Sequence, residues 1–269
     1  MCELFGMSSN REATINLSLM QLAEHGGLSA PHRDGWGIAY YEGTDVRLIK
    51  DAGAAADSDW ISFIRDHNLR SRIVTAHVRT ATMGVPAYRN TQPFVRELAG
   101  RMHLFAHNGW LASIEASPDF SVRRFHPVGE TDSEWAFCAL LEELADVWRS
   151  VGEVPSIDAR IQVVASFAKR LRSLGPANFL YSDGDALFAH GDRRLSSDTH
   201  RVEAPGLVYL QRRCSRGERA FATTGLAIES VDQTITLVAS VPLTQDRWEP
   251  LKEGVVIAVS DGRLVAALQ

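Results

Sequence analysis

Cysteine is scarce in this sequence, and its few occurrences are far apart. The 269 residues include three cysteines, at positions 2, 138 and 214, and no CxxC pair. An odd number of widely spaced cysteines gives little support for a disulfide framework or a thiolate metal site. The nine histidines include no HExxH pattern, which would indicate a zinc-binding helix. We therefore expect free thiols and no metal site.

Long apolar runs and an excess of basic residues are also absent. No apolar run approaches the roughly 18 residues that a membrane span needs, so we expect no membrane partner. The N-terminus lacks the basic and apolar regions of a secretory signal, which favours a cytoplasmic protein. The net charge of −5 argues against a nucleic-acid partner, because phosphate backbones attract basic surfaces.

The residues that are present suit one large globular domain. Hydrophobic residues make up 45% of the chain and charged residues 23%, which allows a sizeable core with an ordinary surface. We find no internal repeat, low-complexity tract or long linker. We therefore expect a single domain over residues 1–269.

The order of the apolar patterns predicts a layered α+β architecture. Residues 131–148 predict the clearest helix, because Thr131 as N-cap and Glu134 three residues later form a capping box. Residues 157–175 predict a second helix, with Gly175-Pro176 as its stop signal. Strands are expected on both sides of this helical pair. That order favours two sheets packed on each other with helices outside.

The remaining elements follow from periodicity and turn residues. Two further helices are predicted, at residues 15–24 and 57–67, together with a hairpin that has Gly43 in its turn. The strand that contains Asn108 and Gly109 is expected to end in an Asn-Gly turn. The predicted strands are 2–8, 35–43, 46–53, 71–82, 103–111, 178–184, 186–191, 206–212, 219–224, 234–240 and 255–262.

The second residue is the first candidate for chemistry. Initiator methionine is usually removed before a small residue such as Cys2, which would leave a thiol and a free α-amine on one residue. Such a residue is a nucleophile that carries its own base, the arrangement of enzymes with an N-terminal threonine. In the alternative interpretation, Cys2 is a small apolar residue of the first strand, since free cysteine is often buried.

Four other short stretches have both a chemical and a structural interpretation. HRDGWG at 32–37 could be only a glycine-rich turn. Arg79 lies in an otherwise apolar strand, which favours partial burial and therefore a partner. Asn108-Gly109 could form a plain turn, and Asp132 is favoured in the first turn of a helix by the dipole alone.

Together these residues supply what hydrolysis of an amino acid's side-chain amide needs. Cys2 and its amine supply a nucleophile and a base. The Asn108 amide and the Gly109 N–H could donate to a developing oxyanion. Arg79 could bind an α-carboxylate and Asp132 an α-ammonium, which is the minimum that recognises a zwitterion.

In this order and at these spacings, the stretches MCELFGM, HRDGWG, HVRTAT, AHNG and GETDSE resemble a class II glutamine amidotransferase domain. The similarity is greatest to small stand-alone members, and NFLYSDG belongs to it. The motifs cover residues 2–184, and residues 185–269 share only a strand-rich character. The resemblance implies an N-terminal-nucleophile (Ntn) hydrolase fold, a four-layer αββα sandwich.

The resemblance also implies roles for individual residues. Cys2 would be the nucleophile with its α-amine as base, and Asn108 and Gly109 would form the oxyanion hole. Arg79 would hold the substrate's α-carboxylate and Asp132 its α-ammonium. The backbone near Asp34, Gly35, Thr80 and Thr82 would line the pocket. No metal or organic cofactor is required. Gln92 is a departure, because many relatives place a histidine there.

The expected activity is hydrolysis of the γ-amide of glutamine through a γ-glutamyl thioester, with release of ammonia and glutamate. One alternative is an amidohydrolase that acts on a larger γ-glutamyl amide or conjugate, which the same clamp would recognise. Another is a non-catalytic module that binds glutamine and partners a synthase. The ammonia would pass to a separate acceptor protein, or the reaction would stop at hydrolysis.

Overall fold

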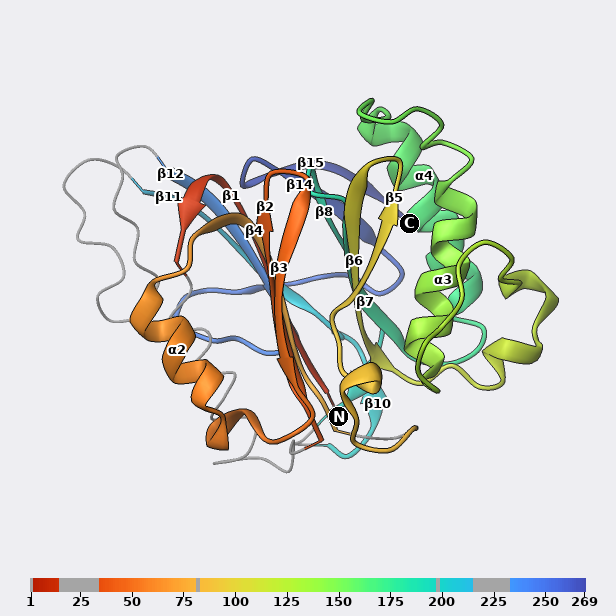
Figure 1. Ribbon diagram of the computed structural model, residues 1–269, viewed down its shortest axis with the longest axis horizontal. Helices are drawn as coiled ribbons and strands as arrows, with labels where there is room; N and C mark the ends of the chain where they lie inside the picture. Colours follow the sequence, from red (N-terminus) through yellow and green to blue (C-terminus); the bar gives the residue numbers. More distant parts are fainter. Residues whose placement is uncertain (1, 15–33, 81–82, 197–198, 215–232) are drawn as a thin grey trace.

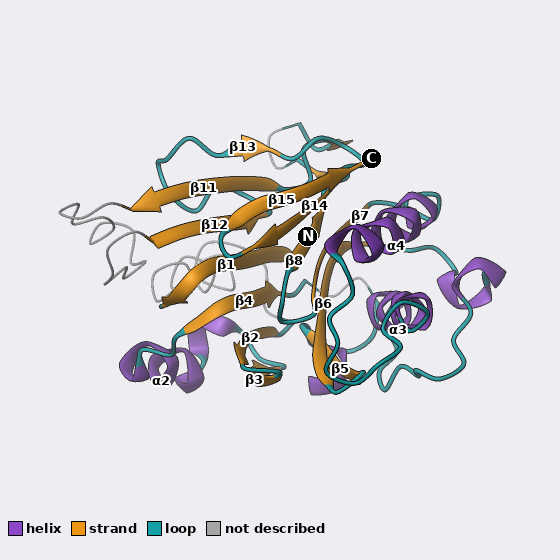
Figure 2. Cartoon of the chain, turned by 90° about the horizontal axis from the view of Figure 1, so that it is seen from above, coloured by secondary structure: helices purple, strands orange, loops and turns teal. Residues whose placement is uncertain are grey.

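The computed structural model describes residues 2–14, 34–80, 83–196, 199–214 and 233–269, and these form four layers. A helix covers one side, two β-sheets lie in the middle and a pair of helices covers the other side (Figures 1 and 2). The outer helices are α2 (Asp59–His67) on one side, and α3 (Asp132–Leu144) and α4 (Ile157–Leu171) on the other. The predicted αββα sandwich of the α+β class is confirmed.

Within the described residues, the first sheet has seven strands in the order β13-β11-β12-β1-β4-β2-β3. Its central strand, β1, pairs antiparallel with β12 on one edge and with β4 on the other. The bounds are β1 (Glu3–Ala13), β2 (Trp36–Glu42), β3 (Asp45–Asp51), β4 (Ser71–Val78), β11 (Val208–Cys214), β12 (Gln233–Ala239) and β13 (Glu249–Pro250).

The second sheet, in the part of the chain that the structure describes, has six strands in the order β15-β14-β8-β7-β6-β5. A separate two-stranded ribbon pairs β9 (Arg194–Leu195) with β10 (Val202–Glu203). The bounds in the second sheet are β5 (Phe94–Leu98), β6 (Arg101–Gly109), β7 (Ala177–Ser182), β8 (Leu187–His190), β14 (Val256–Ser260) and β15 (Arg263–Leu268).

Three apolar cores separate the four layers, because side chains alternate along each strand. Leu4 and Leu180 belong to the core between the sheets. Trp36 on the first sheet packs with Ile64 of α2, and Phe105 on the second sheet packs with Phe137 of α3. Central strands are therefore buried on both faces, as a four-layer sandwich requires.

Most of the predicted elements that lie in the described residues are confirmed. The hairpin β2–β3 turns at Gly43, whose φ is +66°. Thr131 caps α3 by accepting a hydrogen bond from the Glu134 N–H at 3.2 Å. The Glu134 carboxylate accepts from the Gly129 N–H instead of completing the capping box. The predicted helix 15–24 and strand 219–224 lie outside the described residues.

The predicted Asn-Gly turn is wrong. Asn108 and Gly109 lie within β6, where they pair with Asn178 and Ala177 of β7. Glycine is needed there for close packing, since a Cβ at Gly109 would lie 1.7 Å from the Pro176 carbonyl oxygen. Within the described residues, five strands are additional to the prediction: β5, β9, β10, β13 and β15. None of the helices in the described ranges is long and apolar enough to span a membrane.

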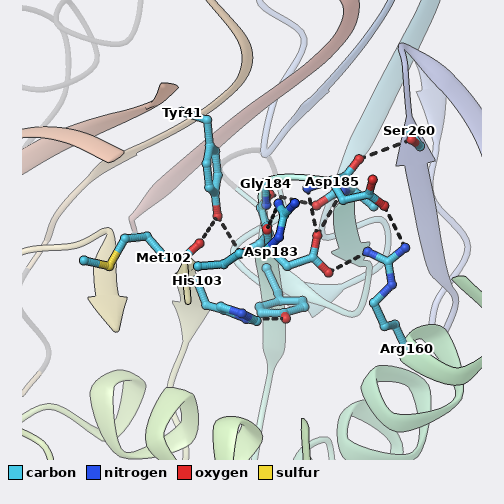
Figure 3. Close-up of polar contacts among 12 residues, drawn as sticks. Tyr41, Met102, His103, Arg160, Asp183, Gly184, Asp185 and Ser260 are labelled. Atoms are coloured by element: carbon cyan, nitrogen blue, oxygen red, sulfur yellow. Dashed lines mark hydrogen bonds and ion pairs between the residues drawn. The ribbon is translucent and has the colours of Figure 1, made fainter. Parts of the chain in front are cut away.

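A buried ion pair fixes α4 to the second sheet (Figure 3). Arg160 donates to Asp183 at 2.8 Å and to Asp185 at 2.7 Å, and its side chain is only 4% exposed. Asp183 is fully buried and also accepts from the N–H groups of Asp185 and Ala186. The Asp183 carboxylate therefore joins α4 to the turn between β7 and β8.

We expect Asp183→Ala to lower the free energy of unfolding by about 3 kcal/mol, because it leaves the buried Arg160 cation without its main partner. The matched control is Asp185→Ala, whose side chain is 41% exposed and whose loss should cost less than about 1 kcal/mol. Urea denaturation measures both values. Equal effects of the two substitutions would contradict a dominant role for the buried pair.

Candidate active site

Cys2 is held against the residues that follow β4. Because β1 and β4 are antiparallel and Glu3 pairs with Val78, the start of β1 lies beside the end of β4. The Thr80 N–H donates to Cys2 Sγ at 3.3 Å, and the thiol donates to Thr80 O at 3.4 Å. A backbone N–H that points at the sulfur is suited to stabilise a thiolate.

Burial raises the pKa of the Cys2 thiol above its ordinary value. The hydrogen bond from Thr80 and the nearby Arg79 guanidinium act in the opposite direction, and the Asp132 carboxylate adds to the increase. Arg79 and Asp132 are therefore both close enough to influence the sulfur. With a raised pKa the thiol is neutral near pH 7, so its activation needs a base.

Asn108 reaches Cys2 from the opposite sheet. Its Nδ2 donates to the carbonyl oxygen of Cys2 and lies 3.4 Å from Ser240 Oγ. On the β7 side, Asn178 Nδ2 donates to Asn108 O at 3.2 Å. Asn108 is 1% exposed, and Gly109 follows it at the end of β6. The Asn108 amide, one of the two predicted oxyanion donors, thus contacts the residue predicted to be the nucleophile.

Arg79 is 3% exposed and fully engaged by backbone oxygens. Its guanidinium donates to the carbonyls of Asp34, Met83, Gly84 and Val85 at 2.6–3.4 Å. Its own N–H donates to Gly35 O at 2.8 Å. The partners of this buried cation are therefore backbone carbonyls, and the backbone of Asp34 and Gly35 lies against Arg79.

Asp132 is 7% exposed, at the first residue of α3. Its carboxylate accepts from the N–H of Leu111 at 2.7 Å, from the N–H of Ser133 at 2.8 Å and from Ser133 Oγ at 3.2 Å. Ser133 Oγ also contacts His107 Nδ1 at 2.9 Å. These contacts tie the start of α3 to β6 and to the segment after it, so Asp132 is fixed beside the other site residues.

The structure leaves one predicted residue undescribed and adds others. Thr82 lies outside the described residues. Gln92, His107, Ser133 and Asn178 hold the site residues, and of these the sequence patterns single out only Gln92. Asn178 begins the NFLYSDG stretch of the resemblance, but the sequence predicts no role for it, because its role depends on the pairing of β7 with β6.

The described residues contain no group of three or more metal-ligating side chains. A polar cavity of about 540 Å³ lies toward the other end of the sandwich, lined by residues such as Ser9, Tyr41, Asp185 and Asp261. None of the predicted site residues lines this cavity.

Comparison with known proteins places the chain in a family. The family described as "Glutamine amidotransferases class-II" matches residues 1–269. The chain is 36% identical over 261 residues to "Putative glutamine amidotransferase YafJ" of Escherichia coli (strain K12), covering 94% of this chain and 95% of that protein.

Solved structures agree with this assignment. The crystal structure of a "predicted glutamine amidotransferase from Pseudomonas aeruginosa PA01" superposes with a TM-score of 0.68 at 33% identity, over 98% of this chain and 100% of that one. The glutamine phosphoribosylpyrophosphate amidotransferase from B. subtilis has the same fold, with a TM-score of 0.60 at 17% identity, over all of this chain and 49% of that one. The chain belongs to the class-II glutamine amidotransferases.

Proposed function

We propose that this protein hydrolyses the γ-amide of glutamine through a γ-glutamyl thioester on Cys2. The observation that carries the proposal is the position of Cys2, whose sulfur contacts the Thr80 backbone while Asn108 contacts the same residue from the other sheet. Family membership supports glutamine as the substrate. We further propose that residues 1–269 act as one amidotransferase domain, since β12 and β14 from the C-terminal part lie within the two sheets.

The reaction needs a base for the thiol, and the α-amine of Cys2 can supply it once Met1 is removed. Sulfur attacks the amide carbon while the thiol proton passes to the amine and then to the leaving nitrogen, which departs as ammonia. Water then attacks the thioester, which releases glutamate and restores the thiol. Asn108 Nδ2 and the Gly109 N–H would donate to the oxyanion in both steps.

Substrate recognition would use the two opposite charges near Cys2. The Arg79 guanidinium suits an α-carboxylate and the Asp132 carboxylate suits an α-ammonium. The Thr80 and Thr82 segment and the Asp34-Gly35 backbone would line the pocket between them. The ammonia would go to a separate acceptor protein or leave free, and ammonia assays with and without cell extract distinguish these two outcomes.

Cys2→Ser should abolish turnover of glutamine while the fold persists, because a hydroxyl is a far weaker nucleophile near neutral pH. Cys138→Ala is the matched control, since Cys138 is buried in α3 and away from the site, and it should retain activity. Cys214 lies outside every motif and should also be dispensable. The activity of Cys2→Ser and Cys138→Ala is measured as the release of ammonia and glutamate from glutamine. Full activity of Cys2→Ser would contradict a thioester on this residue.

The active protein should lack Met1. A Met1–Cys2 peptide bond would acylate the amine, and an amide nitrogen cannot accept the thiol proton. Intact mass spectrometry of the active preparation should therefore show the chain without its first residue. A homogeneous preparation that retains Met1 and has full activity would exclude the α-amine as the base.

Variants of the site should separate by kinetic parameter. Arg79→Lys and Asp132→Asn should raise KM strongly with a smaller effect on kcat, because both contacts exist before and during the reaction. Asn108→Ala should lower kcat by about 10²–10³ with little change in KM, since its donor acts on charge that forms only in the transition state. Steady-state kinetics measures all three. Normal glutamine binding by Asp132→Asn would leave Asp132 as a helix-start residue only.

A further inference from the structure

We propose that Gln92 is a positioning residue that fixes the catalytic end of β6, and with it the Asn108 amide. The inference rests on the proposed function, because it assigns a role toward the same oxyanion donors.

The strand beside β6 ends before it reaches the site. The pairing of β5 with β6 runs from Leu98 and Arg101 to Phe94 and Phe105. The residue before β5 is Pro93, which has no N–H to donate. The pairing therefore leaves His107, whose backbone groups face this edge, without a partner from β5. A strand edge with unpaired N–H and C=O groups needs another partner when it is buried.

The Gln92 side chain fills this place. Its Oε1 accepts from the His107 N–H at 2.6 Å, and its Nε2 lies 3.2 Å from His107 O, to which it donates. A carboxamide offers the same donor and acceptor as a peptide group, so one side chain replaces the missing strand residue. Gln92 is 4% exposed and His107 1% exposed, so water does not readily take over these bonds.

Asn108 depends on this contact through the geometry of the strand. Successive residues of an antiparallel strand direct their backbone groups to opposite edges. His107 bonds to Gln92 on one edge, and Asn108 accepts from Asn178 on the other. The catalytic end of β6 is thus held from both edges. Without Gln92 this end keeps its β7 edge and its contacts with the start of α3, but the edge that faces β5 is no longer held. The Asn108 side chain then loses its fixed direction toward Cys2.

The backbone of Gln92 is in turn fixed by the first sheet. An added Cβ at Gly37 of β2 would lie 2.4 Å from Gln92 O and 2.7 Å from Lys50 Cβ. Glycine at position 37 therefore permits the segment before β5 to lie directly on β2. Gln92 consequently connects the first sheet, which carries Cys2, to the end of β6, which carries Asn108.

Gln92→Met tests the proposal, because methionine keeps the length of the side chain and removes both hydrogen bonds. Gln233→Met is the matched control. Gln233 is also a buried glutamine that bonds to Ser9 Oγ at 2.8 Å and to Arg11 O at 3.3 Å, far along β1 from Cys2. Both variants should lose stability. Only Gln92→Met should lower kcat for glutamine, by about tenfold to a hundredfold, with KM within about twofold of its original value.

A double variant shows whether the effect passes through Asn108. In the Asn108→Ala background the amide that Gln92 positions is already gone, so adding Gln92→Met should lower kcat by less than about twofold. A full multiplicative loss, an equal loss in Gln233→Met, or a change confined to KM would overturn the positioning role.

Hydrogen exchange separates this proposal from the proposed function. The His107 amide should exchange at least about tenfold faster in Gln92→Met than in Gln233→Met, because its acceptor is removed. This readout does not depend on turnover. If the unaltered protein fails to hydrolyse glutamine, the proposed function fails while the exchange result still decides whether Gln92 holds β6. Unchanged exchange at His107 would overturn the inference even in an active enzyme.

Discussion

The central place of β1 in its sheet is the constraint on which the site depends. Chain ends usually fray, and a nucleophile at residue 2 would have no defined position without a strand directly behind it. Here β1 begins at Glu3 and is paired on both edges, by β12 and by β4. The same antiparallel register brings Arg79 and Thr80 beside Cys2, because β4 ends where β1 begins. One strand pairing therefore places three of the candidate site residues.

The second sheet supplies the complementary groups, and the sandwich holds them at a fixed separation. Asn108 lies at the end of β6, and Asp132 at the start of α3 is bonded to the Leu111 N–H just beyond that strand. The apolar core between the sheets sets the spacing across which Asn108 reaches Cys2.

The Arg160–Asp183 pair lies at the other end of the sandwich from Cys2. The backbone of Asp185, beside this pair, accepts a hydrogen bond from Ser260 Oγ, and the nearby Gly262 N–H donates to Ser8 Oγ. At about 3.3 Å per residue, Ser8 lies roughly 20 Å along β1 from Cys2, so the pair stabilises the fold without contacting the site.

Short sequence patterns correctly predicted those elements that depend only on residues close together in the chain. The Thr131 cap and the Gly43 turn depend on nearest neighbours, and the structure confirms them. The Asn108-Gly109 turn was wrong because the close approach of Pro176, from a segment far along the chain, fixes the glycine. The five motifs named the candidate residues through resemblance, yet Gln92 and Asn178 could not be assigned a role. Their side chains bond to the backbone of His107 and Asn108. These backbone groups come within reach only after the strands of the second sheet have paired.

The two charges near Cys2 differ in what substrate binding would require of them. The Arg79 guanidinium already donates to four backbone carbonyls, so a substrate carboxylate has to replace some of these neutral acceptors. A guanidinium forms a stronger hydrogen bond with a carboxylate than with a neutral carbonyl. The free energy gained at Arg79 is therefore only the difference between these two kinds of hydrogen bond. The Asp132 carboxylate accepts from three donors but has about four lone-pair sites, so an ammonium can be added without displacing them. A carboxylate that binds Arg79 would therefore displace carbonyl groups of the Met83–Val85 backbone from the guanidinium. An ammonium that binds Asp132 would leave the existing hydrogen bonds of that carboxylate in place.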